Sequence, residues 1–422
     1  MTRTRAIDLE LKERAKQVIP GGMYGHEATT LLPDAFPQFF KKGQAGRLWD
    51  VDGNEYVDYI CAYGPNLLGY HFEPVERAAA EQRALGDTLT GPSAVMVELA
   101  ESFVNLVDHA DWAMFCKNGT DATSMSLVIA RAKTKRRKIL CAQGTYHGAA
   151  PWCTPRPAGI LEEDRAHIVY YQYNDANSLA EAFKAHEGDV AGVIATPFRH
   201  EVFGDQFLPN LEYAKLARQL CDEHGALLIV DDVRAGLRLA RDCSWSAIGI
   251  KPDLSCWGKC FANGYPISAV LGSESARKAA AEIFVTGSFW FSAVPMAAAI
   301  ETLKHVRESD YLERTIDLGT RLRNGLGLLA RNHGFGLKQT GPVQMPQILF
   351  EEDKDFRVGY AWAAECVERG AYIHPYHNQF ICGAHTEKDI EDTLAAADEA
   401  FSVVKKTWKS LEPHKTLVAL RG

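Results

Sequence analysis

The sequence predicts an α/β protein: a seven-stranded, mostly parallel sheet forms a large domain, and both chain ends form a smaller α+β domain. Short apolar runs alternate with helical patterns between residues 112 and 271, which is typical of a parallel sheet covered by helices on both faces. The two flanks lack this alternation. We therefore expect residues 1–62 and 307–422 to pack together, with residues 63–306 as the large domain.

The first flank combines a helix, a turn and a hairpin. Apolar spacing predicts a helix over Asp8–Val18, and the glycine-rich turn Pro20–Gly22 follows it. The segments Arg47–Val51 and Tyr56–Ile60 flank Asp52-Gly53-Asn54, a strong hairpin signal because these residues tolerate the backbone angles of tight turns.

The middle of the chain supplies the sheet. Strands are predicted at Trp112–Cys116, Lys138–Ala142, His167–Gln172, Val190–Thr196, Ala226–Asp232, Leu254–Trp257 and Ile267–Leu271. Helical patterns lie between several of them, at Ala122–Lys133, Ala180–Glu187 and Leu211–His224. The second flank gives helices from about residue 307, strands near Gln347–Phe350 and Phe380–Cys382, and a last helix at Glu387–Lys405.

Composition excludes several classes of protein. Of the 422 residues, 46% are hydrophobic and 24% charged, as in globular proteins rather than disordered ones. The net charge of −8 disfavours binding to nucleic acid or anionic membranes. No apolar run approaches the ~20 residues that span a bilayer. The polar N-terminus does not fit a signal peptide, and the ten scattered cysteines indicate a reducing compartment, so we expect a cytoplasmic protein.

Residues with possible chemical roles follow the predicted strands, where ligands bind in open α/β sheets. Asn118, Gly119 and Thr120 open a helix, and free N–H groups at such a position suit a phosphate. Tyr146 and His147 follow the next strand. At this point a simple helix cap remains an equal interpretation for the first group.

A carboxylate and a lysine complete the pattern. Asp231 and Val233 follow the strand near residue 230, and Lys259 follows Leu254–Trp257 among small and apolar residues. A partly desolvated lysine has a lowered pKa and can act as an amine nucleophile. Together with a phosphate cradle and an aromatic ring, these residues are the components of a pyridoxal 5'-phosphate (PLP) site.

On these residues the sequence resembles the class III, fold-type I PLP-dependent aminotransferases, a family that includes glutamate-1-semialdehyde aminomutase and omega-amine transaminases. The resemblance covers nearly the whole chain. It rests on Pro20–Gly22, Leu48–Gly53, Tyr146–Gly148, Asp231–Val233 and Gly258-Lys259, with a typical interval of 28 residues between Asp231 and Lys259.

The resemblance implies a role for each site residue. Lys259 would bond covalently to PLP and shuttle the substrate proton, while Asp231 would keep the pyridine nitrogen protonated. Tyr146 and Val233 would pack on opposite ring faces. The remaining cofactor residues would be Asn118, Gly119 and Thr120 at the phosphate, His147, and Ser288 donated by a neighbouring subunit. The family pattern thereby implies a homodimer with shared active sites and no metal.

Longer runs, at Val18–Glu27, His109–Gly119, Thr196–Phe203, Leu254–Ile267 and Thr286–Ala297, are similar to a branch of the family that passes the amine of hydrolysed fumonisin, a long-chain amino-polyol, to pyruvate. The resemblance implies a hydrophobic amine donor and pyruvate as substrates. An aminomutase of the glutamate-1-semialdehyde type, or another PLP reaction at the same site, is the alternative.

Two departures from the family pattern bear on the substrates. Thr196 stands where relatives carry a glutamate that pairs with a carboxylate-binding arginine. We therefore expect Arg199 to bind the keto acid, with a surface salt bridge as the competing interpretation. Trp290 and Phe291 follow the interface position, so with Tyr24 they are expected to line an apolar channel for the amine.

Two other motifs resemble sites of different chemistry, but their context argues against both. Gly325-x-Gly327-x-x-Ala330 mimics a dinucleotide fingerprint, but it lies in a helical pattern without a preceding strand. His374, His377 and His385 lack the spacing of a metal site, so we expect satisfied or substrate-facing histidines.

Overall fold

The computed structural model describes residues 3–200 and 202–421. Within them, a seven-stranded sheet has the order β4-β10-β9-β8-β7-β5-β6. Strand β10 runs antiparallel to both of its neighbours and the other pairs are parallel, which confirms the predicted fold class. The strands are β4 (Trp112–Cys116), β5 (Lys138–Ala142), β6 (Ile168–Tyr171), β7 (Val190–Ala195), β8 (Leu227–Asp231), β9 (Leu254–Trp257) and β10 (Ser268–Gly272).

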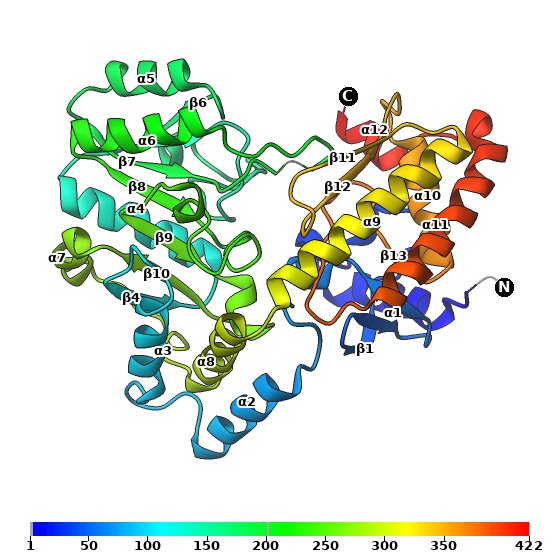
Figure 1. Ribbon diagram of the computed structural model, residues 1–422, viewed down its shortest axis with the longest axis horizontal. Coiled ribbons are helices and arrows are strands. Elements are labelled where there is room, and N and C mark those ends of the chain that lie inside the picture. The colour runs from blue at the N-terminus through cyan, green and yellow to red at the C-terminus, as the bar shows by residue number, and fades with distance from the viewer. Residues whose placement is uncertain (1–2, 201, 422) are drawn as a thin grey trace.

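The central strands are buried on both faces because successive side chains enter two different apolar cores. In β7, Val190, Val193 and Ala195 enter one core, whereas Ala191 and Ile194 enter the other. The first core also takes side chains from α2 (Glu73–Leu85), α3 (Val95–Val104), α5 (Ala176–Ala185), α6 (Leu211–His224) and α8 (Ala293–Glu308). The second takes them from α4 (Gly119–Thr134) and α7 (Glu274–Glu282), so helices cover both sides of the sheet (Figure 1).

Both ends of the chain contribute to a separate apolar core, whose buried residues lie between positions 32 and 60 and between 318 and 404. A four-stranded sheet of order β1-β2-β3-β13 joins the two segments, because Val57 of β3 pairs in parallel with Ala371 of β13. The strands are β1 (Phe40–Gln44), β2 (Arg47–Asp50), β3 (Glu55–Asp58) and β13 (Ala371–Tyr372), with a hairpin of β11 (Leu337–Thr340) and β12 (Gln347–Phe350) nearby.

The helices of this part are α1 (Ala6–Val18), α9 (Tyr311–His333), α10 (Arg357–Glu368), α11 (Glu387–Thr407) and α12 (Lys415–Arg421). Figure 1 shows both termini on this side of the molecule. Gly325 lies inside α9, where a methyl group would be 2.6 Å from a Leu394 side-chain carbon. This glycine therefore allows close contact between α9 and α11, and it forms no nucleotide loop.

The predicted strand at Phe380–Cys382 is wrong. The segment is irregular because its backbone N–H groups reach two different parts of the chain: Phe380 donates to the Tyr59 carbonyl at 2.7 Å, and Ile381 donates to the Gln344 carbonyl at 2.9 Å. Neighbouring bonds to separate partners do not build a ladder. The strand that completes the small sheet is β13 instead.

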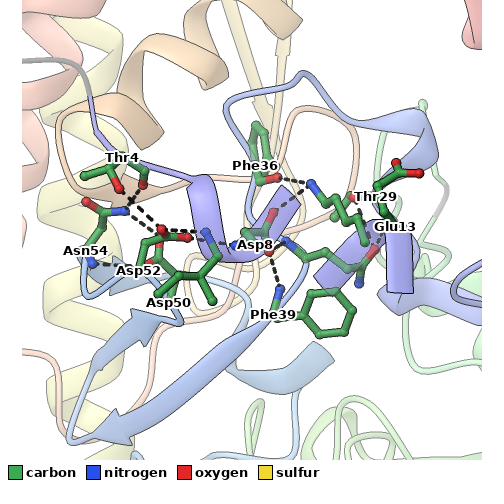
Figure 2. Close-up of polar contacts among 12 residues, drawn as sticks. Thr4, Asp8, Glu13, Thr29, Phe36, Phe39, Asp50, Asp52 and Asn54 are labelled. Atoms are coloured by element: carbon green, nitrogen blue, oxygen red, sulfur yellow. Dashed lines mark hydrogen bonds and ion pairs between the residues drawn. The ribbon is translucent and has the colours of Figure 1, made fainter. Parts of the chain in front are cut away.

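Helix α1 is fixed by the turn of the β2–β3 hairpin. Its N-cap residue, Arg5, makes no side-chain cap, and Asp52 accepts the Ile7 and Asp8 backbone N–H groups instead, each at 2.9 Å (Figure 2). Asp8 in turn accepts two backbone N–H groups from Gln38 and Phe39 at 2.8 Å. Carboxylates at a helix start satisfy N–H groups that have no helical partner.

In the described part of the chain, no helix has both the length and the apolar character that crossing a bilayer requires.

Candidate active site

A cavity of about 370 Å³ lies at the carboxyl ends of the parallel strands. Its lining comes from the segments that follow β4, β5, β7, β8 and β9, because strands that run in the same direction end at the same edge of the sheet. His26 and Pro65, from the N-terminal part of the chain, also line it. The predicted residues in its wall are Asn118, Gly119, Thr120, Tyr146, His147, Asp231, Val233 and Lys259.

The N-terminus of α4 forms one wall of the cavity. Asn118 caps the helix by accepting the Asp121 backbone N–H at 3.0 Å. Gly119 follows, and a methyl group there would lie 2.6 Å from a Val233 methyl carbon. Thr120 Oγ1 accepts the Ala149 N–H at 3.1 Å, which ties this wall to the segment after β5. The free N–H groups and the helix dipole favour an anion here.

Asp231 and His147 form a buried pair. His147 Nδ1 lies 2.7 Å from Asp231 Oδ2, and the Val233 N–H donates to Asp231 Oδ1 at 3.2 Å. On its other side, His147 Nε2 lies 3.1 Å from Thr145 Oγ1, whose own proton goes to the Ala142 carbonyl at 2.6 Å. Both ring nitrogens of His147 therefore act as donors.

The protonation of His147 agrees with this geometry. Burial lowers the pKa of the imidazole, but Cys141 and the Asp231 carboxylate outweigh burial and raise it to about 10. The charged imidazolium fixes the orientation of the Asp231 carboxylate. The carboxylate then has an oriented negative charge at the cavity wall.

Lys259 is held at the end of β9 in a left-handed backbone conformation, with φ of 51°. Its Nζ donates to the Tyr63 carbonyl at 2.7 Å. That carbonyl belongs to a run of three left-handed residues, Cys61 to Tyr63, with φ between 48° and 61°. Such conformations cost energy in non-glycine residues and occur preferentially at functional sites. Burial and the charges of Arg234 and Arg238 lower the pKa of Lys259 to about 7.

Five residues predicted for the site do not line the cavity of the single chain. Tyr24 is 71% exposed, Ser288 and Phe291 are exposed, and Trp290 packs partly buried against the core beside α4 and α7. Arg199 also lies outside the lining. Its backbone forms a β-bridge to Phe207, with N–O distances of 2.8 and 2.9 Å. Its neighbours Phe198 and His200 do line the cavity, so the substrate contact expected of Arg199 stays a prediction.

The cavity contains residues that the sequence did not single out. Arg234 lines it, with Nη1 at 2.6 Å from Asn378 Oδ1 and 3.3 Å from His377 Nε2. His26 and His200 line it as well, and burial lowers the pKa of each ring. The sequence does carry a signal for Arg234, because it is a charged residue at a strand end, three positions after Asp231.

The three histidines considered as metal ligands have other contacts. His377 Nδ1 lies 2.7 Å from the Asn378 carbonyl oxygen, and His374 Nδ1 accepts the His377 N–H at 3.1 Å. His385 accepts the Cys382 N–H at 3.1 Å, away from the other two. Thr196, at the end of β7, donates its hydroxyl proton to the Phe198 carbonyl at 2.9 Å.

Comparison with known proteins assigns the family. The protein family described as "Aminotransferase class-III" matches residues 32–382. The chain belongs to the class III aminotransferases. An aminopentol aminotransferase of Sphingopyxis macrogoltabida is 65% identical over 98% of both chains, and a 3-aminobutyryl-CoA aminotransferase of Cloacimonas acidaminovorans is 32% identical over 95% of this chain and 98% of the relative. The solved PLP internal aldimine form of the FumI protein of Sphingopyxis sp. MTA144 superposes with a TM-score of 0.97 at 65% identity, covering 97% of this chain and 99% of that one.

Class III aminotransferases use PLP, and the cavity fits it. The helix N-terminus of α4 suits the phosphate, and Gly119 leaves the space that a methyl group would fill. The lysine with a lowered pKa suits the aldehyde. The Asp231 carboxylate, oriented by His147, suits the pyridine nitrogen.

Proposed function

We propose that this aminotransferase moves the amino group of a long-chain amino-polyol of the aminopentol type to pyruvate, giving a ketone and alanine. The observation that carries the proposal is the 65% identity to the aminopentol aminotransferase over nearly the whole chain. Thr196 supports it, because its hydroxyl bonds to its own loop and presents no carboxylate to pair with a substrate-binding arginine. An uncharged amine donor fits such a site.

The site residues then have distinct tasks. PLP, when bound, supplies an aldehyde for the amine and a ring that accepts the electrons left behind when the substrate carbon loses its proton. Lys259 Nζ carries that proton, and a pKa of about 7 populates both its charged and its neutral form near neutral pH. The Asp231 carboxylate would hold a proton at the pyridine nitrogen, and His147 positions this carboxylate.

Three residues bind the phosphate in this proposal. Asn118 sets the start of α4, Gly119 allows close approach, and Thr120 lies in the first turn, whose N–H groups donate to the phosphate oxygens. Tyr146 and Val233, both in the cavity wall, hold the ring between them. Each of these tasks is the one that the family resemblance implies.

We further propose a homodimer with shared active sites. The segment after α7 carries Phe284, Phe289 and Phe291, which are 91%, 63% and 37% exposed. A cluster of exposed aromatics marks an interaction surface. The partner subunit's Ser288 would complete the phosphate site, and the aromatic residues Tyr24, Trp290 and Phe291 would wall the amine channel between subunits. The cytoplasmic location stays a prediction from the cysteine usage.

The test supplies the holoenzyme with aminopentol and pyruvate and measures alanine and the keto product by chromatography and mass spectrometry. Alanine formed in equal amount to the keto product supports the proposal, and Lys259→Ala, which lacks the amine, is the inactive control. If alanine forms from pyruvate with other amines but not with aminopentol, the proposed amine donor is wrong. Conversion of glutamate-1-semialdehyde to 5-aminolevulinate, without pyruvate, would instead identify an aminomutase.

A further inference from the structure

Two of the basic side chains in the cavity wall, Arg234 and Lys259, and the neighbouring Arg238 differ in their hydrogen bonds. Arg238 donates to the carbonyl groups of Ile381, Gly64 and Asn66, at 3.1, 2.7 and 3.4 Å. Lys259 donates to the Tyr63 carbonyl. Arg234 bonds to Asn378 and His377 through Nη1, and its Nη2 and Nε make no hydrogen bond to a residue that the structure describes. Among these three side chains, only Arg234 therefore keeps two donor nitrogens, Nε and Nη2, for a ligand.

The charges around Arg234 are not balanced. Asp231 is engaged by His147, which carries the compensating positive charge. His200 and His377 are neutral at pH 7, since burial and the charge of Arg234 lower the pKa of each ring well below its usual range. Burial lowers the pKa of Arg234 only to about 10, so it stays charged. A buried cation without an anionic partner is unfavourable, and an anionic ligand relieves it.

The partners of Arg234 are held in place by their own contacts. Gln379 Nε2 donates to the His374 and His377 carbonyl groups at 3.0 and 2.7 Å, and Asn378 Nδ2 donates to the Gln379 carbonyl at 2.9 Å. The segment therefore presents the Asn378 oxygen in a fixed orientation. A guanidinium held at one nitrogen is preorganised to bind a carboxylate with its other N–H groups.

We propose that Arg234, held by Asn378 and His377, binds the carboxylate of the α-keto acid acceptor. The proposal rests on the proposed function, in which an uncharged amine and a keto acid react in the same cavity. The amine has no carboxylate, so Arg234 acts in the keto-acid half of the reaction and not in the amine half. It replaces Arg199 in that role, because Arg234 lies in the cavity wall and Arg199 does not.

The kinetic test compares Arg234→Gln and Arg234→Lys with the wild-type holoenzyme in separate half-reactions, followed by cofactor absorbance. We expect Arg234→Gln to lower the second-order rate with pyruvate by about 10- to 150-fold, the range of a lost charge-assisted hydrogen bond. The rates with aminopentol, and with propanal as an acceptor without a carboxylate, should change by less than about threefold. Arg234→Lys should recover part of the loss, because it restores the charge but not the paired donors.

A binding measurement gives a readout that does not depend on turnover. Oxamate, an unreactive analogue of pyruvate with the same carboxylate, is titrated calorimetrically into the holoenzyme. We expect Arg234→Gln to weaken oxamate binding by about tenfold or more, with the affinity for PLP unchanged. Arg307→Gln removes one positive charge from an exposed position on α8 and is the matched control.

Three outcomes would overturn the proposal. Equal losses with pyruvate and propanal would show a general effect on the site. A loss of PLP affinity in Arg234→Gln would assign the arginine to the cofactor phosphate. A selective pyruvate loss in Arg199→Gln, with Arg234→Gln unaffected, would return the role to Arg199. If the wild type transfers no amine to pyruvate, the proposed function fails, and the oxamate titration still decides the role of Arg234.

Discussion

In the proposed function Lys259 is the residue that would bond to PLP, and an amine is nucleophilic only when it is uncharged. Burial and two nearby arginines lower its pKa to about 7 from an ordinary value of 10.5. The neutral form therefore predominates above about pH 7, several units lower than in a solvated lysine. The bond to the Tyr63 carbonyl keeps the nitrogen at one place in the cavity.

The first prediction concerns the pH dependence of cofactor attachment. The rate at which the apoprotein captures PLP covalently should rise about tenfold per pH unit below pH 7 and level off above it. Borohydride trapping followed by mass spectrometry measures the attached fraction. Lys259→Ala should bind PLP without a bond that borohydride can reduce. The PLP affinity of this variant, measured over the same pH range, corrects the capture rates for the titration of PLP itself. A rate that still rises between pH 8 and 9.5 would contradict the lowered pKa.

Asp231 carries a second prediction. In Asp231→Asn the phosphate site and Lys259 remain, so PLP should still attach, but turnover should fall by about 100-fold or more because the pyridine nitrogen loses its anionic partner. His147→Gln keeps a donor for Asp231 but removes the charge, and it should cost less. Steady-state alanine formation and the absorbance spectrum of the holoenzyme measure both effects. Normal turnover with a normal spectrum would remove Asp231 from this role.

The sequence predicted the site residues that follow strands better than those that reach the site from distant parts of the chain. Lys259, Asp231 and Asn118 each follow a strand, and a parallel sheet brings strand ends to one edge whatever the details of packing. His26 reaches the same cavity from an N-terminal segment that depends on the contact between two cores, and no local pattern reports such contacts. Arg199 and Arg234 both follow strands. Which of them faces the cavity depends on the path of each loop, which propensities do not specify.

At the scale of elements, the strands of the large sheet begin and end within one residue of their predicted positions. Their apolar runs are buried on both faces, so the composition marks them directly. The strand expected at Phe380–Cys382 fails for a related reason. Its residues are buried and apolar, but they pack as an irregular segment between Tyr59 and Gln344, and burial alone does not distinguish the two cases.

The start of α4 gives a prediction about cofactor affinity. In Gly119→Ala the added methyl group would lie 2.6 Å from a Val233 methyl carbon, at the wall that we assign to the phosphate and the ring. The side chain of Val233 must move, so we expect PLP affinity to fall by about tenfold or more. Equilibrium dialysis measures it. Gly91→Ala, where the added carbon meets nothing within 4 Å, is the control and should bind PLP normally.

The cap that the hairpin provides to α1 gives a prediction about stability. Asp52→Ala leaves the Ile7 and Asp8 N–H groups without this acceptor, so the free energy of unfolding should fall by about 1 kcal/mol. Burial raises the pKa of Asp52, but bonds from these N–H groups outweigh it and lower the pKa below 3.8. The contribution is thus present at neutral pH and disappears as the pH falls below about 4.

Urea unfolding at pH 7 and pH 3 measures this effect. The difference between Asp52→Ala and the wild type should shrink at the lower pH. Asp34→Ala, at an exposed turn position, is the control. A difference that is the same at both pH values would show that the charge of Asp52 does not stabilise α1.

At the scale of the whole molecule, a shared active site makes a prediction that a single-chain site does not. Lys259→Ala and Ser288→Asp should each be inactive as homodimers. In a mixed dimer, one site combines the intact lysine of one subunit with the intact serine of the other. Random exchange of subunits should therefore restore about a quarter of the wild-type activity. Assays before and after exchange measure it, and a mixture that stays inactive while native mass spectrometry shows mixed dimers would exclude sharing through Ser288.

The pairing of β3 with β13 has a consequence for biosynthesis. A ribosome releases Val57 early and Ala371 only after more than three hundred further residues, so the first hairpin waits without its neighbour while the large sheet, complete by Gly272, assembles. A nascent chain therefore acquires the lysine and the helix start before it acquires the segment that carries Asn378. Premature termination after the large sheet leaves a protein that contains the cofactor residues but not the partners of Arg234. Under the proposed role of Arg234, such a fragment would not bind the acceptor, and the last quarter of the chain would govern when amine transfer to a keto acid can begin.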